Sequence, residues 1–128
     1  MGLTTLKRRA DFLRVRGGLR WSTPALVLEA KPRIHGPDET RAHAGIARFG
    51  FTVTKKIGNA VVRNRVRRRF KEAVRELLPL ARDGFDYVLI ARSLAIEQSY
   101  ADLKADLVQA LERIHRPRVQ GRRERGTG

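Results

Sequence analysis

The segment 55–75, KKIGNAVVRNRVRRRFKEAVR, limits what this chain can fold into more than any other part of it. It holds nine Lys or Arg residues against one Glu, a net +8 out of the +15 of the whole chain. Apolar side chains recur at the spacing of one helix face, at Val62, Val66, Phe70, Ala73 and Leu77. The pattern predicts a helix from about Asn59 to Leu78, ended by Pro79, that buries one stripe and carries cations elsewhere.

The charge of this segment favours a polyanionic partner over an ordinary solvated helix. Exposed helices usually mix charges of both signs four residues apart, whereas the segment 55–75 has only Glu72. Lys55 and Lys56 add charge at the helix N-terminus, where free N–H groups already attract anions. Nucleic acid is therefore the expected partner. The basic region of a zipper protein has a similar pattern, but leucine heptads would have to follow, and none follow Pro79.

The composition is that of a single small domain. The 128 residues are 41% hydrophobic, enough for one core, and we expect one domain over 1–116 and a basic, disordered tail over 117–128. No Cys is present, so disulfides and thiolate metal sites are excluded. No apolar run has the length of a membrane span or a secretory signal, so we expect a cytoplasmic protein. Arg outnumbers Lys 22 to 6, which suits phosphate recognition but equally suits a biased genome.

The N-terminal segment predicts a first helix, capped by Thr4 or Thr5 and running to about Arg16. Its core stripe is expected to comprise Leu6, Ala10 and Leu13. Phe12 and Val15 lie far from this stripe at 100° per residue, so an aromatic ring occupies a second face of the helix.

The rest of the chain predicts three strands and one further helix. The strands are expected at 24–30, 46–54 and 85–91. An exposed loop is expected over 31–44. Ser99 and Asp102 resemble a capping box that opens a last helix, closed by Pro117. The apolar stripe of that helix is Leu103, Leu107, Ala110, Leu111 and Ile114. One small sheet covered by helices would bury all these stripes.

The basic segment resembles the protein subunit family of bacterial ribonuclease P. The family pattern is Lys-Lys-x-Gly-Asn-Ala-Val-x-Arg-Asn-Arg-x-x-Arg, and residues 55–68 here are KKIGNAVVRNRVRR. The similarity extends to Asp11-Phe12-x-x-Val15, to 50–53 and to 86–92, and it covers about residues 3–115. It implies an α+β fold, a two-layer α/β sandwich with a small mixed four-stranded sheet and three helices. Leu19–Trp21 would be the fourth strand, and the crossover through the basic helix would be left-handed, against the usual preference.

The resemblance also implies a function. Ribonuclease P removes the 5′ leader from precursor tRNA, and its RNA subunit, with Mg²⁺, performs the hydrolysis. The protein would bind the catalytic RNA and the leader, with no catalytic side chain, no membrane contact and no obligate protein partner. The Mg²⁺ would be held mainly by the RNA subunit, and no residue of the protein is firmly assigned to it. The residues expected to bind the RNA subunit are Arg63, Asn64, Arg65, Arg67, Arg68, Lys71 and Arg75. Those expected at the leader or its phosphates are Phe12, Arg16, Thr52, Thr54, Lys55, Lys56 and Asn59.

Phe12 has two possible roles. Its ring could stack on an unpaired base, which is worth about 1–3 kcal/mol, or it could pack under the sheet. Related sequences often carry a second aromatic residue four positions later, where this chain has Arg16. The leader contact is therefore expected to be more electrostatic here and less dependent on stacking.

Side-chain catalysis is not indicated. His35, His43 and His115 lack metal-ligand spacing, and Asp83 and Asp86 suit a turn better than an acid–base pair. Two further hypotheses stay open at this point. One is a structural, ribosomal-type RNA-binding protein with no processing role, and the other is a binder of membrane surfaces or of polyanions in general.

Overall fold

The computed structural model describes residues 3–33 and 47–116. Within them lies one mixed four-stranded sheet, in the order β1-β2-β4-β3. Its strands are β1 (Leu19–Ser22), β2 (Leu26–Pro32), β3 (Arg48–Thr52) and β4 (Phe85–Ala91). Strands β1, β2 and β4 pair antiparallel, whereas β3 and β4 run parallel. The predicted mixed sheet is confirmed, including the fourth strand that begins at Leu19.

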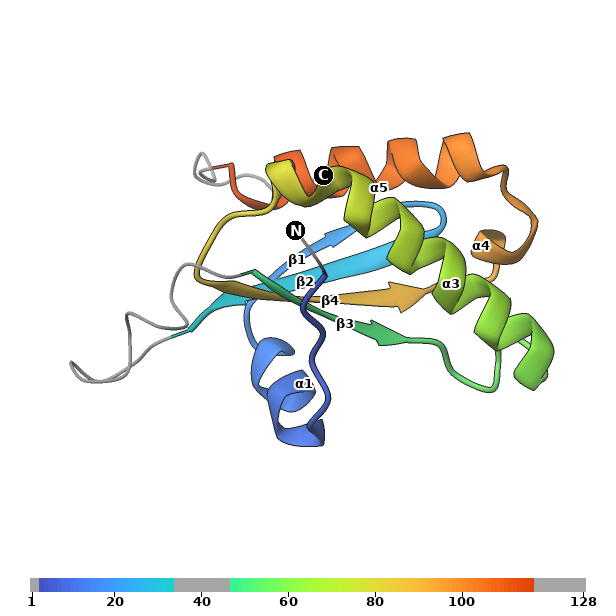
Figure 1. Ribbon diagram of the computed structural model, residues 1–128, viewed down its shortest axis with the longest axis horizontal. Helices are drawn as coiled ribbons and strands as arrows, with labels where there is room; N and C mark the ends of the chain where they lie inside the picture. The colour runs from blue at the N-terminus through green and yellow to red at the C-terminus, as the bar shows by residue number, and fades with distance from the viewer. Residues whose placement is uncertain (1–2, 34–46, 117–128) are drawn as a thin grey trace.

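Two long helices cover one face of the sheet. They are α3 (Ala60–Leu77) and α5 (Tyr100–Ile114), and the short α1 (Arg9–Val15) lies on the opposite face (Figure 1). Pro79 stands in a 3-10 turn, Leu78–Leu80, that ends α3 as predicted. The four-residue helix α4 (Leu94–Glu97) was not predicted, and with it the described residues hold four α-helices where three were expected. The handedness of the β3–α3–β4 crossover stays a prediction.

The main core lies between the sheet and the two long helices. Phe49 of β3 and Tyr87 of β4 are fully buried there, with stacked rings whose centroids are 4.8 Å apart. All five predicted stripe residues of α5 are buried, and its cap is confirmed because the Ser99 side chain accepts a hydrogen bond from the Asp102 N–H. On α3 the predicted stripe is also buried, apart from the half-buried Val62, and Val74 joins it.

The start of the first helix was predicted wrongly. Thr4 and Thr5 cap nothing, since residues 4–6 run alongside β3: Leu6 donates to the Phe49 carbonyl at 2.8 Å, and the Phe49 N–H donates to the Thr4 carbonyl at 2.9 Å. The edge of β3 offers backbone partners that a helix start at this point would forgo. Helix α1 begins only at Arg9, and it has no side-chain cap.

The buried face of this helix was also predicted wrongly. Ala10 is exposed and Leu13 is 46% exposed, whereas Val15 is fully buried and Phe12 is half-buried. A small second cluster, formed by Leu6, Val15 and Val88, draws this face of α1 onto the sheet. The strand expected at 24–30 lies two residues later, at 26–32, so Lys31 and Pro32 belong to β2 and not to a loop. Residues 34–44 of that loop, which include His35 and His43, and the tail over 117–128 lie outside the described residues.

Candidate RNA-binding site

The turn before α3 is built by the Asn59 side chain. Its Oδ1 accepts a hydrogen bond from the Val62 N–H at 3.0 Å, which caps the helix. The Arg63 Nε donates to the Gly58 carbonyl at 3.1 Å and closes the same turn from the helix side. Because Oδ1 is used in the cap, the side-chain NH₂ group of Asn59 is the part that can donate a hydrogen bond to a ligand. The first turn of α3 contains no acidic residue, so its N-terminal dipole is not neutralised from within the helix.

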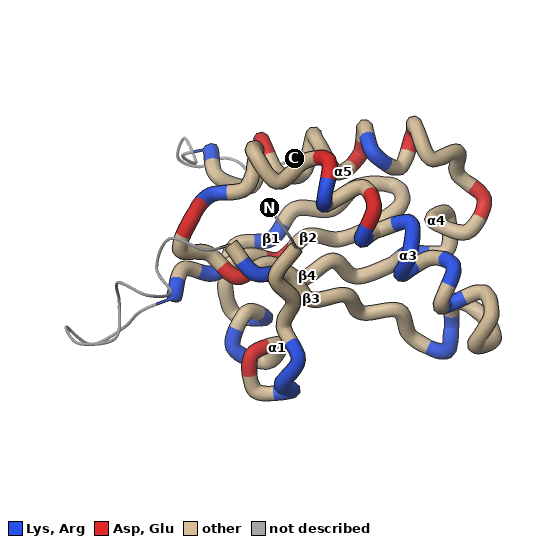
Figure 2. Tube along the Cα trace, viewed as in Figure 1, with Lys and Arg blue, Asp and Glu red and all other residues tan. Residues whose placement is uncertain are grey.

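Seven predicted RNA-binding residues lie along α3, on the part of the helix surface that we call the basic face. Its members are Arg63, Asn64, Arg65, Arg67, Arg68, Lys71 and Arg75. Figure 2 shows Lys and Arg positions following one another along this helix. Asn64, Arg65 and Arg68 are exposed, while Arg67 is half-buried and its Nη1 donates to the Asn64 Oδ1 at 3.1 Å. Such a surface can hold several phosphates at once.

Carboxylates neutralise little of the basic face. The exposed pair Arg75–Glu72, at 3.7 Å, is the sole ion pair recorded there within the described ranges. The second acid of α3, Glu76, turns to α5 instead and accepts hydrogen bonds from Lys104 and Tyr100. The hydrogen bond from Lys104, followed by that from Tyr100, lowers the pKa of Glu76.

Arg69 differs from its basic neighbours because its side chain is half-buried against α4. Its Nη1 donates to the Ala95 carbonyl at 3.0 Å, and its Nη2 donates to the Gln98 carbonyl. The helical angle places Arg69 at the border of the apolar stripe, but the sequence does not predict α4. This arginine therefore joins two helices, and its guanidinium is occupied.

On the α1 side of the sheet, Phe12 packs directly on the backbone of β3. A Cβ atom added at Gly50 would lie 2.5 Å from Phe12 Cε2 and 2.7 Å from Cζ, so only glycine leaves room for the ring. Phe12 is nevertheless half-buried, and part of it remains accessible. The packing role of Phe12 is thus present, and a base could still contact its open part. Gly50 is a site residue that the sequence analysis missed.

The remaining residues predicted at the leader are spread around the end of β3 and the end of α1. Thr52 is half-buried at the end of β3, and Thr54, Lys55 and Lys56 follow it on the surface. Arg16 is exposed just after α1. The lysines and the threonines therefore lie beside the N-terminus of α3, while Arg16 belongs to a different segment.

Asp86 belongs to β4, within the strand predicted at 85–91, and not to the turn at Gly84 that precedes it. Its carboxylate is fully buried in β4 and accepts hydrogen bonds from three arginines: Arg14 at 2.5 Å, Arg33 at 2.5 Å, and Arg48 at 2.8 and 2.7 Å. Burial acts to raise the pKa of Asp86, but the hydrogen bonds from Arg48 and Arg33, with the charge of Arg48, hold it below its ordinary value. The sequence holds one indication of this cluster: Asp86 is a single acidic residue inside the apolar run 85–91, so a buried carboxylate with cationic partners could have been expected.

Asp86 joins α1 to the sheet. Arg14 belongs to α1 and Arg48 to β3, and Arg14 also donates to the Pro32 carbonyl of β2 at 3.1 Å. The carboxylate therefore fixes the helix that carries Phe12 against the strands beneath it. The turn prediction does hold for the preceding residues, because Gly84 adopts φ 80°.

His115 is engaged in the core rather than near other potential metal ligands. Its Nε2 lies 2.6 Å from the Tyr87 hydroxyl. The same hydroxyl accepts a hydrogen bond from the Arg82 N–H at 2.7 Å. Burial, and then the charge of Arg82, lowers the pKa of His115, and burial raises the pKa of Tyr87 to about 12. In the part of the chain that the structure describes, no three His, Cys, Asp or Glu residues come together as metal ligands. No helix there is both long and apolar enough to cross a membrane.

Comparison with known proteins identifies the family. The family model described as ribonuclease P matches residues 3–115. The ribonuclease P protein component of Paramagnetospirillum magneticum is 47% identical over 114 residues, which cover 88% of this chain and 83% of that protein. The corresponding protein of Erythrobacter litoralis is 43% identical over 123 residues, with 94% and 93% covered.

Solved structures agree on the fold. The RNase P protein from Thermotoga maritima is similar with a TM-score of 0.72 at 24% identity, covering 87% of this chain and 97% of that one. The Staphylococcus aureus RNase P protein has a TM-score of 0.71 at 23% identity, covering 88% and 97%. At such identity these structures support the fold alone, whereas the sequence relatives carry the assignment. The chain belongs to the ribonuclease P protein family.

Proposed function

We propose that this subunit of ribonuclease P binds the catalytic RNA subunit through the basic face of α3 and the 5′ leader of precursor tRNA through the α1 side of the sheet. One observation carries the first half of the proposal. The basic face exposes Arg65 and Arg68, and only Arg75 in it has a recorded ion pair to a carboxylate in the described ranges. RNA phosphates are the partners that such a surface lacks, since binding them releases counterions.

The leader would lie on the side of the sheet where Phe12 is. The open part of its ring offers a face for one base, and Lys55 and Lys56 offer cations where β3 leads into α3. Arg16 would contribute charge at the other end of α1. A single strand fits this arrangement better than a duplex, because a base can reach the Phe12 ring only when it is unpaired.

The chemistry of the reaction is assigned to RNA-bound Mg²⁺. Magnesium takes oxygen ligands, chiefly carboxylates and phosphates, and the exposed surface of α3 is cationic. The buried carboxylate of Asp86 is already saturated by three guanidinium groups. The role of the protein in a cytoplasmic holoenzyme is then to lower the repulsion between phosphates and to hold the leader, which reduces the Mg²⁺ concentration that cleavage requires.

Reconstitution with the cognate RNA subunit tests the proposal. At low Mg²⁺, the wild-type protein should restore cleavage of precursor tRNA, and Arg68→Ala should bind the RNA subunit more weakly. Its slope of log affinity against log salt should flatten by up to about one unit. Arg116→Ala is the matched control, because it removes the same charge from an exposed site just after α5. Equal slopes for Arg68→Ala and wild type would mean that the basic face does not touch phosphates.

A further inference from the structure

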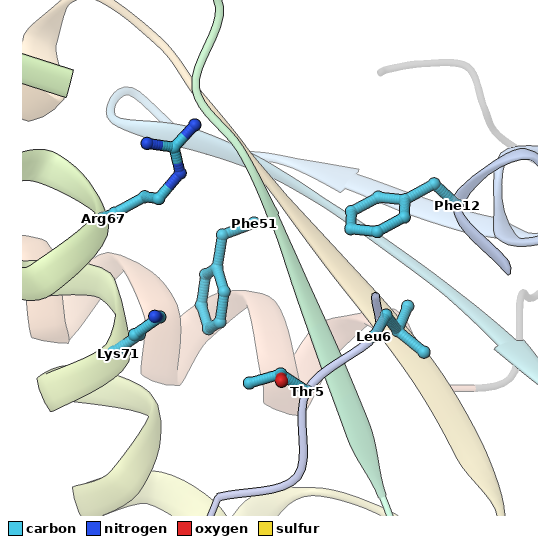
Figure 3. A pocket seen from close by; sticks show the side chains of 6 residues that line it. All are labelled: Thr5, Leu6, Phe12, Phe51, Arg67 and Lys71. Carbon is cyan, nitrogen blue, oxygen red and sulfur yellow. The ribbon is translucent and has the colours of Figure 1, made fainter. Parts of the chain in front are cut away.

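A hollow of about 170 Å³ lies at the outer edge of β3, between α1 and α3. Its lining comes from three parts of the chain and comprises Thr5, Leu6, Phe12, Phe51, Arg67 and Lys71. In Figure 3, Arg67 and Lys71 reach towards it from α3, Phe51 stands beside them on β3, and Phe12 approaches from the other side of the strand. The hollow therefore crosses the edge of the sheet, from the face covered by α3 to the face covered by α1.

Among the described residues, the backbone of β3 is paired at Phe49 on this edge and open beyond it. Phe49 exchanges hydrogen bonds with Thr4 and Leu6, after which the N-terminal segment leaves the strand for α1. Backbone groups on alternate residues of a strand point to the same side. The N–H and C=O of Phe51 thus face outwards like those of Phe49, with no backbone partner among the residues that the structure places. An N–H donor and a C=O acceptor are available next to an aromatic ring.

The two cations of the hollow, Arg67 and Lys71, carry charge that no carboxylate of the described residues offsets. Within the described residues neither Arg67 nor Lys71 forms an ion pair, and Arg67 spends one donor on the Asn64 side chain. A guanidinium has five N–H donors, so most of them remain for a ligand. The positive charge of Arg67 and Lys71 favours an anionic ligand. The neighbouring Phe51 ring favours a ligand whose anionic group is attached to a flat apolar group.

We propose that the hollow binds one unpaired nucleotide of RNA, with its phosphate on Arg67 and Lys71 and its base against Phe51. This subsite rests on the proposed RNA-binding function and adds an aromatic contact to it, at a residue that the family motif does not include. The nucleotide can come from the leader or from a single-stranded part of the RNA subunit. Both sources present the same phosphate, ribose and base, and the experiment below distinguishes them.

The test uses the full-length protein and measures three affinities. They are the affinity of the protein for the RNA subunit alone, that of the reconstituted holoenzyme for precursor tRNA, and that of the holoenzyme for mature tRNA. Phe51→Leu keeps an apolar side chain of similar volume but removes the flat ring. It should weaken binding of one partner by roughly tenfold, within the range found for removing a stacked aromatic residue. Loss for the RNA subunit alone places the nucleotide in that RNA, and loss confined to the precursor places it in the leader.

A charge variant gives a second measurement that does not depend on the core. Lys71→Gln should flatten the salt slope for the same partner, and Arg116→Gln, on an exposed site outside both the hollow and the basic face, should leave that slope unchanged. In NMR spectra, the amide resonance of Phe51 should shift when that RNA is added. Normal affinity of Phe51→Leu for all three partners would overturn the subsite. If Arg68→Ala still weakens binding in that case, the proposed RNA-binding role of the basic face of α3 is retained and only the subsite is rejected.

Discussion

Replacing Asp86 by Asn should show how strongly one carboxylate holds α1 to the sheet. Asp86 accepts four hydrogen bonds from Arg14, Arg33 and Arg48. Asn keeps the size of the side chain but loses the charge, and its amide group would face guanidinium donors. Removing one partner of a buried ion pair costs about 3–5 kcal/mol, because the remaining charge stays buried.

The exposure of the three arginines places the expected cost at the low end of that range. Arg14 and Arg48 have side chains 32% and 30% exposed and can turn towards water, whereas that of Arg33 is 3% exposed and stays inside. The low end of the range predicts a loss of about 3 kcal/mol in the free energy of unfolding. Such a loss is a large part of the 5–15 kcal/mol typical of a domain.

Urea unfolding followed by circular dichroism at neutral pH measures this loss. Glu112→Gln is the control, since Glu112 is exposed on α5, and it should change the free energy of unfolding by less than about 0.5 kcal/mol. The pKa of Asp86 is lowered in the folded state, so its contribution is present above the unfolded value, about 3.8, and disappears as the pH falls through the folded pKa. The difference between wild type and Asp86→Asn should therefore shrink in acid.

Two results would refute this reasoning. One is an Asp86→Asn protein within about 1 kcal/mol of wild type at neutral pH, which would mean that the arginines find other partners or water. The other is a stability difference that does not shrink as the pH falls below about 3.8, the value at which the carboxyl group of the unfolded chain takes up its proton.

Three further predictions concern packing and pH. Gly50→Ala places a methyl group against the Phe12 ring, so it should destabilise the fold by about 1–3 kcal/mol and weaken binding of precursor tRNA more than of mature tRNA; an unchanged urea midpoint would show that the ring moves aside freely. Arg69→Met should lower the free energy of unfolding by about 1–3 kcal/mol, through the loss of its bonds to two carbonyls, and leave the salt slope of RNA binding nearly unchanged; a flattened slope would place Arg69 at a phosphate instead. The pKa of His115 is lowered by burial beside Tyr87, so stability should fall as the pH drops below about 6.5, and His115→Gln should lose this part of the pH dependence in urea titrations at pH 5 and 7.5.

The elements with a long or repeated pattern were predictable from sequence. Helix α3 kept its predicted stripe, its predicted start near Asn59 and its end at Pro79, and the strand at 85–91 has the predicted bounds. These features depend on residues close in sequence, where periodicity, capping and proline geometry act directly. The same reasoning predicted which cations of α3 face the solvent, because the 100° rotation per residue determines which side chains lie away from the apolar stripe.

The first helix shows where such reasoning fails. Helix α1 has only seven residues, too few turns for the spacing of apolar residues to show which face is buried. In addition, the backbone groups of Thr4 and Leu6 hydrogen-bond to the edge of β3 and not within a helix. Tertiary contacts then chose the face with Phe12 and Val15 over the one with Leu13. The four residues of α4 have no pattern of their own, and Arg69 helps to hold them.

The sequence by itself determined that a basic, amphipathic helix would follow a strand and present cations to a polyanion, and its motif indicated the family. Only the tertiary structure decided which groups surround Asp86, since its arginine partners lie 72, 53 and 38 residues away along the chain. It likewise decided that Phe12 lies on Gly50 and that β3 leaves an open edge beside Arg67. The reason is physical: local pattern specifies which side chains a segment buries, whereas strand order and edge pairing specify what they are buried against.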